Sequence, residues 1–264
     1  MKSIQNVVVI GSGKLAGHLV PYLHYSGIRI LQIMGRTAGS AKPLADSVGA
    51  QFIIDSTKID AKAECALLLV NDDAIGSVSQ ELSSILSNQC LMIHCSGSQR
   101  PDIISSFFEH RAVLWPLMSF NPGVLIPWEQ VPFFIQGDQY AIDVILRTTQ
   151  HLGLSTYLAD QKTMSSVHLA AVFSNNFSNF NLIISEMILK KTGIPLEVLQ
   201  PIMMQMVQKA FEAGPENTQT GPARRGDRQI VEKQHSFLEE EIPEAADLYL
   251  KISKSIIQHF NSKK

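Results

Sequence analysis

The sequence has few cysteines, and they lack the spacing of a metal or redox site. Its 264 residues include only Cys65, Cys90 and Cys95, with no CxxC pair among them. Buried free thiols in a reducing compartment explain them better than disulfides or a bound metal. We therefore expect no metal site, and we expect only Cys95 to lie close enough to a ligand to contact it.

An excess of charge and a long apolar run are also missing. The 22 basic and 24 acidic residues give a formal net charge of −2 at pH 7, which argues against a general affinity for nucleic acid or an anionic membrane. No apolar run approaches the ~20 residues that a bilayer requires. The first five residues carry no hydrophobic region of an export signal. We expect a cytoplasmic protein whose partners are small molecules.

The most informative stretch begins at residue 7. The apolar run Val7–Ile10 predicts a buried strand of a parallel sheet, and Gly11-x-Gly13-x-x-Ala16 follows it without a spacer. Gly11 permits a tight turn, Gly13 lets the backbone approach a pyrophosphate at the start of a helix, and Ala16 allows close packing. A glycine turn in an unrelated α/β protein is the alternative. The pattern predicts a dinucleotide site with contacts from Gly11, Ser12, Gly13, Lys14, Leu15 and Ala16.

Acidic residues are absent where an NAD-binding protein would usually place one. A helix ending at Gly27 and a second strand over 28–34 complete a βαβ unit, yet the chain has no Asp or Glu from Gly27 to Ala45. Arg36 follows that strand and can contact a 2′-phosphate through two hydrogen bonds, while Thr37 and Ser40 can donate from their hydroxyls. This favours NADP(H) as the cofactor. A solvated arginine in a turn is the alternative.

Strand and helix patterns alternate up to residue 158. We expect strands at 51–54, 65–70, 91–95, 112–115, 131–137 and 155–158, and helices at 40–48, 74–86, from Pro101 onward and at 138–152. Asn71 and Asp72 follow one of these strands, and Cys95, Ser96 and Gly97 end the next. Since parallel strands end at one edge of a sheet, we expect these residues beside the nicotinamide ribose. A helix cap is the alternative for Asp72.

Beyond Asp160 the sequence predicts only helices, at about 161–191, 196–213, 229–239 and 245–260. The first of these is long and apolar around most of its circumference, so other helices must cover it, some of them from a second subunit. The predicted fold is α/β: an N-terminal Rossmann domain with a doubly wound parallel sheet over 1–159, followed by an all-helical substrate and dimerisation domain over 160–264. We predict a homodimer through the C-terminal helices.

Candidate catalytic residues lie in the helical part. His168 could exchange a proton with a carbonyl or imine that hydride reduces, and Asn176 could orient that group. In the segment 220–227, Arg225 could hold a substrate carboxylate while Asp227 orients the guanidinium. The alternatives are polar side chains that satisfy one another at a domain interface and a buried Arg–Asp pair that fixes the loop.

Several motifs of the chain occur together in a known group of proteins. They are Gly11-x-Gly13-x-x-Ala16, residues 70–75, 93–97 and 116–120, His168 with Asn176-Phe177, and Thr220-Gly221-Pro222-x-x-Arg225-Gly226-Asp227. On these motifs the chain resembles the Rossmann-like proteins that carry a C-terminal DUF2520 domain, relatives of pyrroline-5-carboxylate reductase and of the 6-phosphogluconate and 3-hydroxyisobutyrate dehydrogenases. The resemblance implies an NADP-linked oxidoreductase with a helical dimerisation domain, but no particular substrate. Members often have His-Pro-Leu where this chain has Trp115-Pro116-Leu117, and Ser-Asn-Phe where it has Asn175-Asn176-Phe177, which makes Asn176 the matching asparagine.

The predicted activity is hydride transfer between NADP(H) and a small carboxylic acid that bears a carbonyl, imine or hydroxyl group. Arg225 would hold the acid, His168 would exchange the proton and Asn176 would orient the reacting group. The alternative is a non-catalytic NADP(H)-binding sensor or partner-binding protein that uses the fold without the chemistry.

Overall fold

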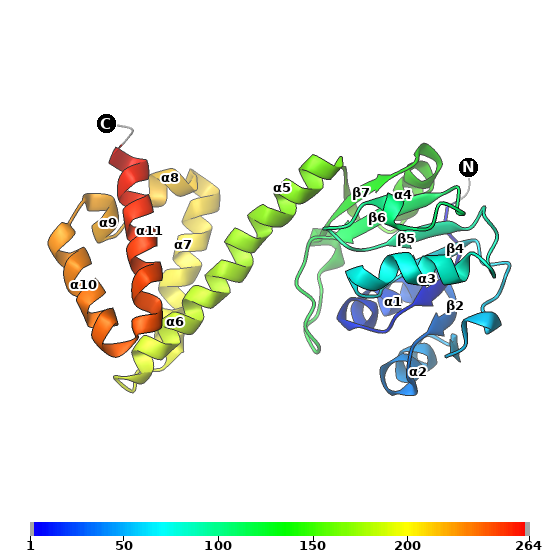
Figure 1. Cartoon of the computed structure of the whole chain (residues 1–264), viewed down its shortest axis with the longest axis horizontal. Coiled ribbons are helices and arrows are strands. Elements are labelled where there is room, and N and C mark those ends of the chain that lie inside the picture. Colours follow the sequence, from blue (N-terminus) through cyan, green and yellow to red (C-terminus); the bar gives the residue numbers. More distant parts are fainter. Residues whose placement is uncertain (1–2, 262–264) are drawn as a thin grey trace. The chain divides into compact units, whose positions relative to one another are not determined.

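The computed structural model describes residues 3–261. The chain divides into two compact units, residues 1–170 and 171–264. Every strand of the described residues belongs to the first unit, and the second is built of helices (Figure 1). The boundary predicted from sequence, after residue 159, lies just before helix α5 (Gln161–Ala171), nearly all of which belongs to the first unit.

The first unit is built on one eight-stranded sheet. The first six strands in spatial order are parallel, which confirms the predicted doubly wound fold. β7 runs antiparallel to β6, and β8 runs parallel to β7. The reversal arises because residues 117–131 contain only a short 3₁₀ turn and no crossover helix that could return the chain for a parallel pairing. The spatial order is β3 (Gln51–Ile53), β2 (Arg29–Met34), β1 (Asn6–Ile10), β4 (Cys65–Leu68), β5 (Leu91–His94), β6 (Arg111–Pro116), β7 (Pro132–Gly137) and β8 (Ser155–Leu158).

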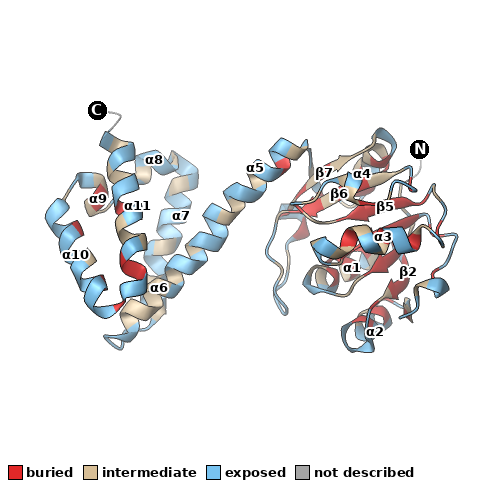
Figure 2. Cartoon of the chain, viewed as in Figure 1, coloured by how far each residue is buried: buried red, intermediate tan, exposed pale blue. Residues whose placement is uncertain are grey.

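Both faces of the central strands are covered, which explains why β1, β4 and β5 are buried without alternation. Val7 and Val9 of β1 pack in a core with helices α1 (Lys14–Tyr25), α2 (Ala38–Ser47) and α4 (Gln139–His151). Val8 and Ile10 point the other way, into a core with α3 (Ile75–Leu82). Figure 2 shows the buried residues concentrated in the strands. Burial on both faces thus favours the β-branched residues of β1.

One predicted helix is wrong. The helix expected from Pro101 is a single 3₁₀ turn, Pro101–Ile103, after which the backbone at Ile104 is extended. Ile104 and Phe108 are fully buried in the α3 core, and the Ser105 N–H donates to Ser79 Oγ at 2.9 Å. Burial of these two side chains against α3 outweighs the helix-starting preference of the proline.

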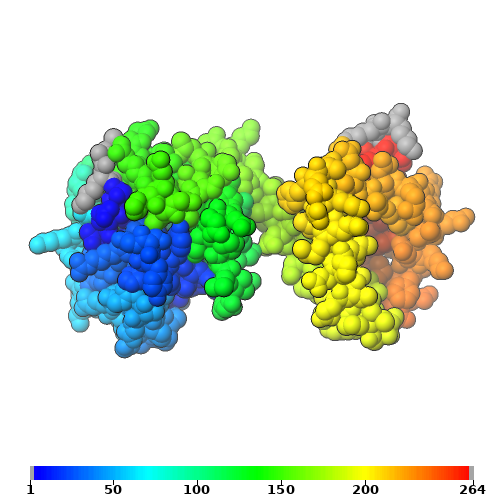
Figure 3. All heavy atoms as spheres, turned by 180° about the vertical axis from the view of Figure 1, so that it is seen from behind, coloured from blue at the N-terminus to red at the C-terminus, as the bar shows by residue number. Residues whose placement is uncertain are grey.

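The second unit has a small core of its own. Leu238, Ile242, Ala245 and Ala246 are buried between the last two helices, with partly buried residues of α6 against them. Figure 3 shows α7, in yellow, on the outer surface of this unit. Its helices are α6 (Ser178–Lys190), α7 (Gln200–Ala213), α8 (Pro215–Thr218), α9 (Pro222–Arg225), α10 (Arg228–Glu241) and α11 (Pro243–Asn261).

The long helix predicted over 161–191 is helical but not uniform. A π-helical turn, Val172–Phe177, separates α5 from α6. Because a π turn bonds residues five apart, it shifts the phase of every later side chain relative to a continuous α-helix. The α-helical register of α5 is therefore not continued unchanged into α6. Within residues 3–261, no helix is long and apolar enough to cross a membrane.

Candidate cofactor and active site

The glycine turn after β1 has the geometry of a nucleotide-binding turn. Gly11 has a φ of +111°, and a Cβ at this position would overlap the carbonyl group of Leu69 at the end of β4. Gly13 caps α1 without a side-chain hydrogen bond, and a Cβ added there would have no neighbour within 4 Å. Ala16 is fully buried. The turn lies between β1 and β4, where the strand order reverses and ligands of such sheets bind.

The segment after β2 contacts this turn directly. The hydroxyls of Ser12 and Ser40 lie 2.8 Å apart, so two residues predicted from separate motifs meet in the structure. Arg36, Thr37 and Ser40 are all exposed. Thr37 precedes α2 without capping it through its side chain, which leaves the first amides of that helix available to an anion.

The loops after β4 and β5 are joined by Asp72. Its Oδ2 accepts hydrogen bonds from Ser96 Oγ at 2.8 Å and from Ser98 Oγ at 2.6 Å. The Ser96 hydroxyl also accepts from the backbone N–H groups of Ser98 and Gln99, each at 3.2 Å. The Ser96 hydroxyl thus fixes the shape of its own loop and joins it to the loop after β4. Asn71 is exposed, and its side chain does not cap the turn that follows.

His94 is a residue of this edge to which sequence reasoning assigned no role. It is fully buried at the end of β5, and its Nδ1 accepts the Ser96 N–H at 3.2 Å. The proton must then lie on Nε2, which donates to the Arg100 carbonyl at 3.2 Å. Burial lowers the pKa of His94, which keeps the ring neutral in this arrangement. A histidine at the end of an otherwise apolar strand is the sequence signal that marks it.

Cys95 lies between His94 and Ser96 in the chain, and its thiol is unreactive. Burial raises its pKa to about 12, so the thiol is protonated at neutral pH. The same cause raises the pKa of Cys90 to about 12 and that of Cys65 well above its ordinary value. Cys95 can line the site beside Gly97, but it does so as a neutral thiol.

His168 lies on α5 in the first unit and contacts the end of β6. Its imidazole is exposed, and its ring centroid is 5.7 Å from that of Trp115. A Cβ on Gly97 would overlap the indole of Trp115, so the loop after β5 also touches this tryptophan. The structure thus links His168, through one indole, to the carboxyl edge of the sheet.

The other three predicted catalytic residues belong to the second unit. Asn176 lies in the π turn and is exposed. The segment 220–227, predicted as a loop, contains the helical turn α9, on which Arg225 is exposed. Asp227 caps α10 by accepting the Ile230 N–H at 3.2 Å, and the described residues contain no ion pair between Arg225 and Asp227. Arg224 instead lies 4.1 Å above the ring of Phe260.

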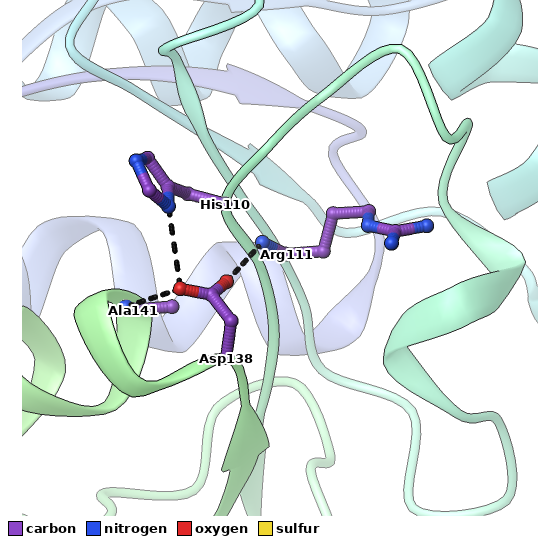
Figure 4. Close-up of polar contacts among 4 residues, drawn as sticks. All are labelled: His110, Arg111, Asp138 and Ala141. Carbon is purple, nitrogen blue, oxygen red and sulfur yellow. Dashed lines mark hydrogen bonds and ion pairs between the residues drawn. The ribbon is translucent and has the colours of Figure 1, made fainter.

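A contact between a histidine and a carboxylate lies at the opposite edge of the sheet. His110 Nδ1 is 3.2 Å from Asp138 Oδ1, and the ring stacks on Tyr140. The same carboxylate accepts the N–H groups of Arg111, at the start of β6, and of Ala141, at the start of α4 (Figure 4). These contacts make Asp138 a structural cap, away from the edge where β1, β4 and β5 end.

Comparisons with known proteins agree with this organisation. Residues 131–256 match the family model of DUF2520, a domain of unknown function, and residues 2–101 match the model of shikimate / quinate 5-dehydrogenase. The first match confirms the resemblance inferred from the sequence motifs. Among curated proteins, no match to this chain was found.

Several solved structures share the fold over nearly the whole chain. A protein of Bacteroides fragilis, provisionally named an NADP oxidoreductase, is 29% identical, with a TM-score of 0.88 over 96% of this chain and 98% of that one. An imine reductase from Myxococcus stipitatus in complex with NADP+ is 16% identical, with a TM-score of 0.73 over 96% and 94%. A pyrroline-5-carboxylate reductase from Coxiella burnetii is 15% identical, with a TM-score of 0.59 over 98% of each chain.

The last two structures are too distant in sequence to show more than a shared fold. Together with the strand order and the family matches, they establish the architecture of this chain. The chain has a Rossmann fold, and its residues 131–256 match the model of the DUF2520 domain.

Proposed function

We propose that this protein is an NADP(H)-dependent oxidoreductase that transfers hydride to or from a small carboxylic acid bearing a carbonyl, imine or hydroxyl group. The observation that carries the proposal is the glycine turn between β1 and β4, which a hydrogen bond between the hydroxyls of Ser12 and Ser40 joins to the Arg36 segment. A nicotinamide dinucleotide fits this turn, because Gly13 leaves open space before α1. The NADP+ complex of the imine reductase supports the choice of cofactor.

The 2′-phosphate of NADP(H) would be held after β2. Arg36 supplies a guanidinium, Thr37 and Ser40 supply hydroxyls, and the uncapped start of α2 supplies amides with the positive end of the helix dipole. No carboxylate follows β2 before Asp46, so the phosphate would meet no repulsion there. NADH lacks this phosphate and would gain nothing from the guanidinium.

The roles in substrate binding and proton transfer go to the residues that the sequence motifs predict. The bound cofactor supplies or accepts the hydride at its nicotinamide ring. His168 exchanges a proton with the oxygen or nitrogen of the reacting group, and Asn176 orients that group by an amide hydrogen bond. Arg225 binds the substrate carboxylate, and Asp227, which caps α10, fixes the end of the turn that presents Arg225.

Cofactor binding by the purified chain tests the first step. We expect NADPH to bind more tightly than NADH, and Arg36→Ala to weaken NADPH roughly 10- to 100-fold, the loss expected for hydrogen bonds to a charged group, with NADH unaffected. Nicotinamide fluorescence measures both affinities. Arg29→Ala is the matched control, because Arg29 is an exposed arginine at the other end of β2. Equal losses in the two variants would remove the phosphate role of Arg36.

Turnover tests the second step. NADPH oxidation is followed with a panel of keto acids and cyclic imines. For any probe that is reduced, we expect His168→Ala to lower kcat ~10²- to 10⁴-fold. Arg225→Ala should raise KM for the probe, whereas Arg224→Ala, which loses only the contact with Phe260, should not. Tight NADPH binding without reduction of any probe would favour the sensor alternative.

We propose further that the helices of the second unit form a homodimer. Neither α6 nor α7 has a buried residue, although both are rich in large apolar side chains. On α7, Phe211 is 90% exposed and Ile202 and Met204 are each 64% exposed. Met204 and Phe211, seven residues apart, lie on one face of α7, and exposed large apolar side chains that share a helix face are typical of protein interfaces. A second copy is the occupant we expect, since the predicted long apolar helix requires helical neighbours.

Sedimentation tests the dimer. Phe211→Glu combined with Met204→Glu should convert a dimer into a monomer, because both charges would enter a desolvated interface on one face of α7. Tyr25→Glu is the control, since Tyr25 is 79% exposed on α1 of the first unit. A monomeric wild type at micromolar concentration would refute the proposal.

A further inference from the structure

Trp115 joins two parts of the candidate site. It lies near the end of β6, with its ring centroid 5.7 Å from that of His168 and 5.6 Å from that of Phe134. The backbone at Gly97 packs against the same indole, and a Cβ added to Gly97 would overlap three carbon atoms of the ring. The indole is therefore in contact both with the loop proposed to flank the nicotinamide and with the residue proposed to move the proton.

The indole itself has little freedom to move. Trp115 is only 9% exposed and shares a cluster with Val113 and Met164, both fully buried. Met164 lies one turn before His168 on α5, so this cluster also attaches the start of that helix to the sheet. His168, in contrast, is exposed and has no hydrogen bond among the described residues. Among residues 3–261, the indole of Trp115 is the one aromatic ring in contact with the imidazole.

We propose that Trp115 is a positioning residue, which holds the imidazole of His168 in a fixed relation to the Cys95–Gly97 loop. The inference rests on the proposed proton-transfer role of His168. An exposed histidine samples several rotamers, and most of them would point away from a reacting group beside the loop. Contact with a rigid indole restricts these rotamers, and small displacements of a catalytic group are costly to the rate.

The same contact explains why residue 97 is glycine. The indole fills the space that a side chain at 97 would occupy, so loop and ring fit together only without a Cβ. Cofactor binding against this loop would then meet a surface that is already fixed relative to His168. The arrangement orients the proton donor before the substrate arrives.

Trp128 provides a matched control. It is the only other tryptophan, is 7% exposed, and stacks on Tyr22 and Phe120 without contact to His168. Replacing either tryptophan removes a buried indole of the first unit. Only replacement of Trp115 removes the support of the imidazole.

The experiment combines a spectroscopic and a kinetic readout on the full chain. The His168 ring resonances, assigned with His168→Asn, are recorded by carbon–proton NMR in wild type, Trp115→Leu, Trp115→Phe and Trp128→Leu, with and without NADP+. We expect Trp115→Leu to remove the ring-current shift of His168, Trp115→Phe to retain part of it, and Trp128→Leu to leave it unchanged.

The kinetic arm uses NADPH with whichever keto acid or cyclic imine of the panel the wild type reduces. We expect Trp115→Leu to lower kcat about 10- to 100-fold, the range for a misplaced catalytic group, with the NADPH affinity within about twofold of wild type. Trp115→Phe should recover part of kcat. Trp128→Leu should leave kcat within about twofold of wild type, because it removes an indole of the same unit without touching His168.

The outcomes distinguish a failure of the positioning role of Trp115 from a failure of the proposed function. Unchanged His168 resonances or an unchanged kcat in Trp115→Leu would overturn the positioning role while leaving the proposed function intact, provided that His168→Ala is impaired. A fully active His168→Ala, or a wild type that reduces no probe, would refute the proposed function and the inference with it. An equal loss of kcat in Trp115→Leu and Trp128→Leu would show a general packing effect and overturn the inference.

Discussion

The contact between Gly97 and Trp115 should make the unfolding free energy sensitive to substitution at either residue. The backbone of Gly97 does not lie in the left-handed region, so Gly97→Ala introduces no backbone strain, only the overlap of one methyl group with the indole. Overpacking of this kind typically costs about 1–3 kcal/mol of unfolding free energy. Trp115→Leu should cost about 2–4 kcal/mol, because it removes a buried aromatic ring from a packed cluster.

The double variant separates this clash from other effects. Leucine leaves space beside residue 97, so the second substitution should relieve part of the first. We expect the loss of unfolding free energy in Gly97→Ala/Trp115→Leu to be about 1–2 kcal/mol smaller than the sum of the losses in the two single variants, which is within the range known for residues in contact. If the two substitutions acted independently, their losses of unfolding free energy would simply add.

Tryptophan fluorescence during urea unfolding measures the cycle. Both tryptophans lie in the first unit, so the signal reports that unit alone, and Trp128 remains as the probe when Trp115 is replaced. Gly17→Ala is the control, because a Cβ there has no neighbour within 4 Å; this change within α1 should stabilise by about 0.5–1 kcal/mol. A neutral Gly97→Ala, or strict additivity, would refute the packing argument.

Three further predictions concern other parts of the first unit. Asp138→Ala should lower the unfolding free energy, measured by urea unfolding, by about 2 kcal/mol, because α4 loses its cap and the Arg111 N–H loses its acceptor. Weaker NADPH binding by this variant would contradict the placement of Asp138 away from the cofactor edge of the sheet. Burial lowers the pKa of His94, so as the pH falls the imidazole is protonated in the unfolded chain before it is protonated in the folded one. The contribution of His94 to the unfolding free energy should therefore be complete above about pH 6.5 and fall as the pH drops below that value. His94→Gln should flatten the pH dependence of the unfolding free energy between pH 7.5 and 5.5, and an unchanged slope would assign that dependence to another group. Because burial raises the pKa of Cys95 to about 12, native protein at pH 8 should react with a disulfide reagent only after unfolding, and rapid labelling of native Cys95 would contradict this.

The local signals of the first unit were sufficient to predict most of its elements. Val7–Ile10 and the glycine pattern predicted β1, the turn and α1, because a buried parallel strand and a nucleotide turn each restrict residue type strongly. The apolar run of β4 likewise predicted a strand in the middle of the sheet. Signals of this kind depend only on neighbours along the chain.

Other features depend on contacts that no local signal carries. Pro101 has the properties of a helix start, yet the burial of Ile104 and Phe108 ended the helix after one turn. The reversed direction of β7 follows from a connection without a crossover helix. The hydrogen bonds of Asp72 to the loop after β5 join residues 24 and 26 positions apart, which spacing does not predict.

For this protein, the sequence by itself determined the α/β class, the glycine turn and the positions of Arg36 and His168, since each follows from periodicity or from a short motif. Only the tertiary structure decided that Ser12 meets Ser40, that His94 is neutral and fixes its loop, and that Trp115 links Gly97 to His168. Such contacts arise when strands distant in sequence end at one edge of a sheet. The chemistry of the site therefore depends on the strand order as much as on the residues that the strands carry.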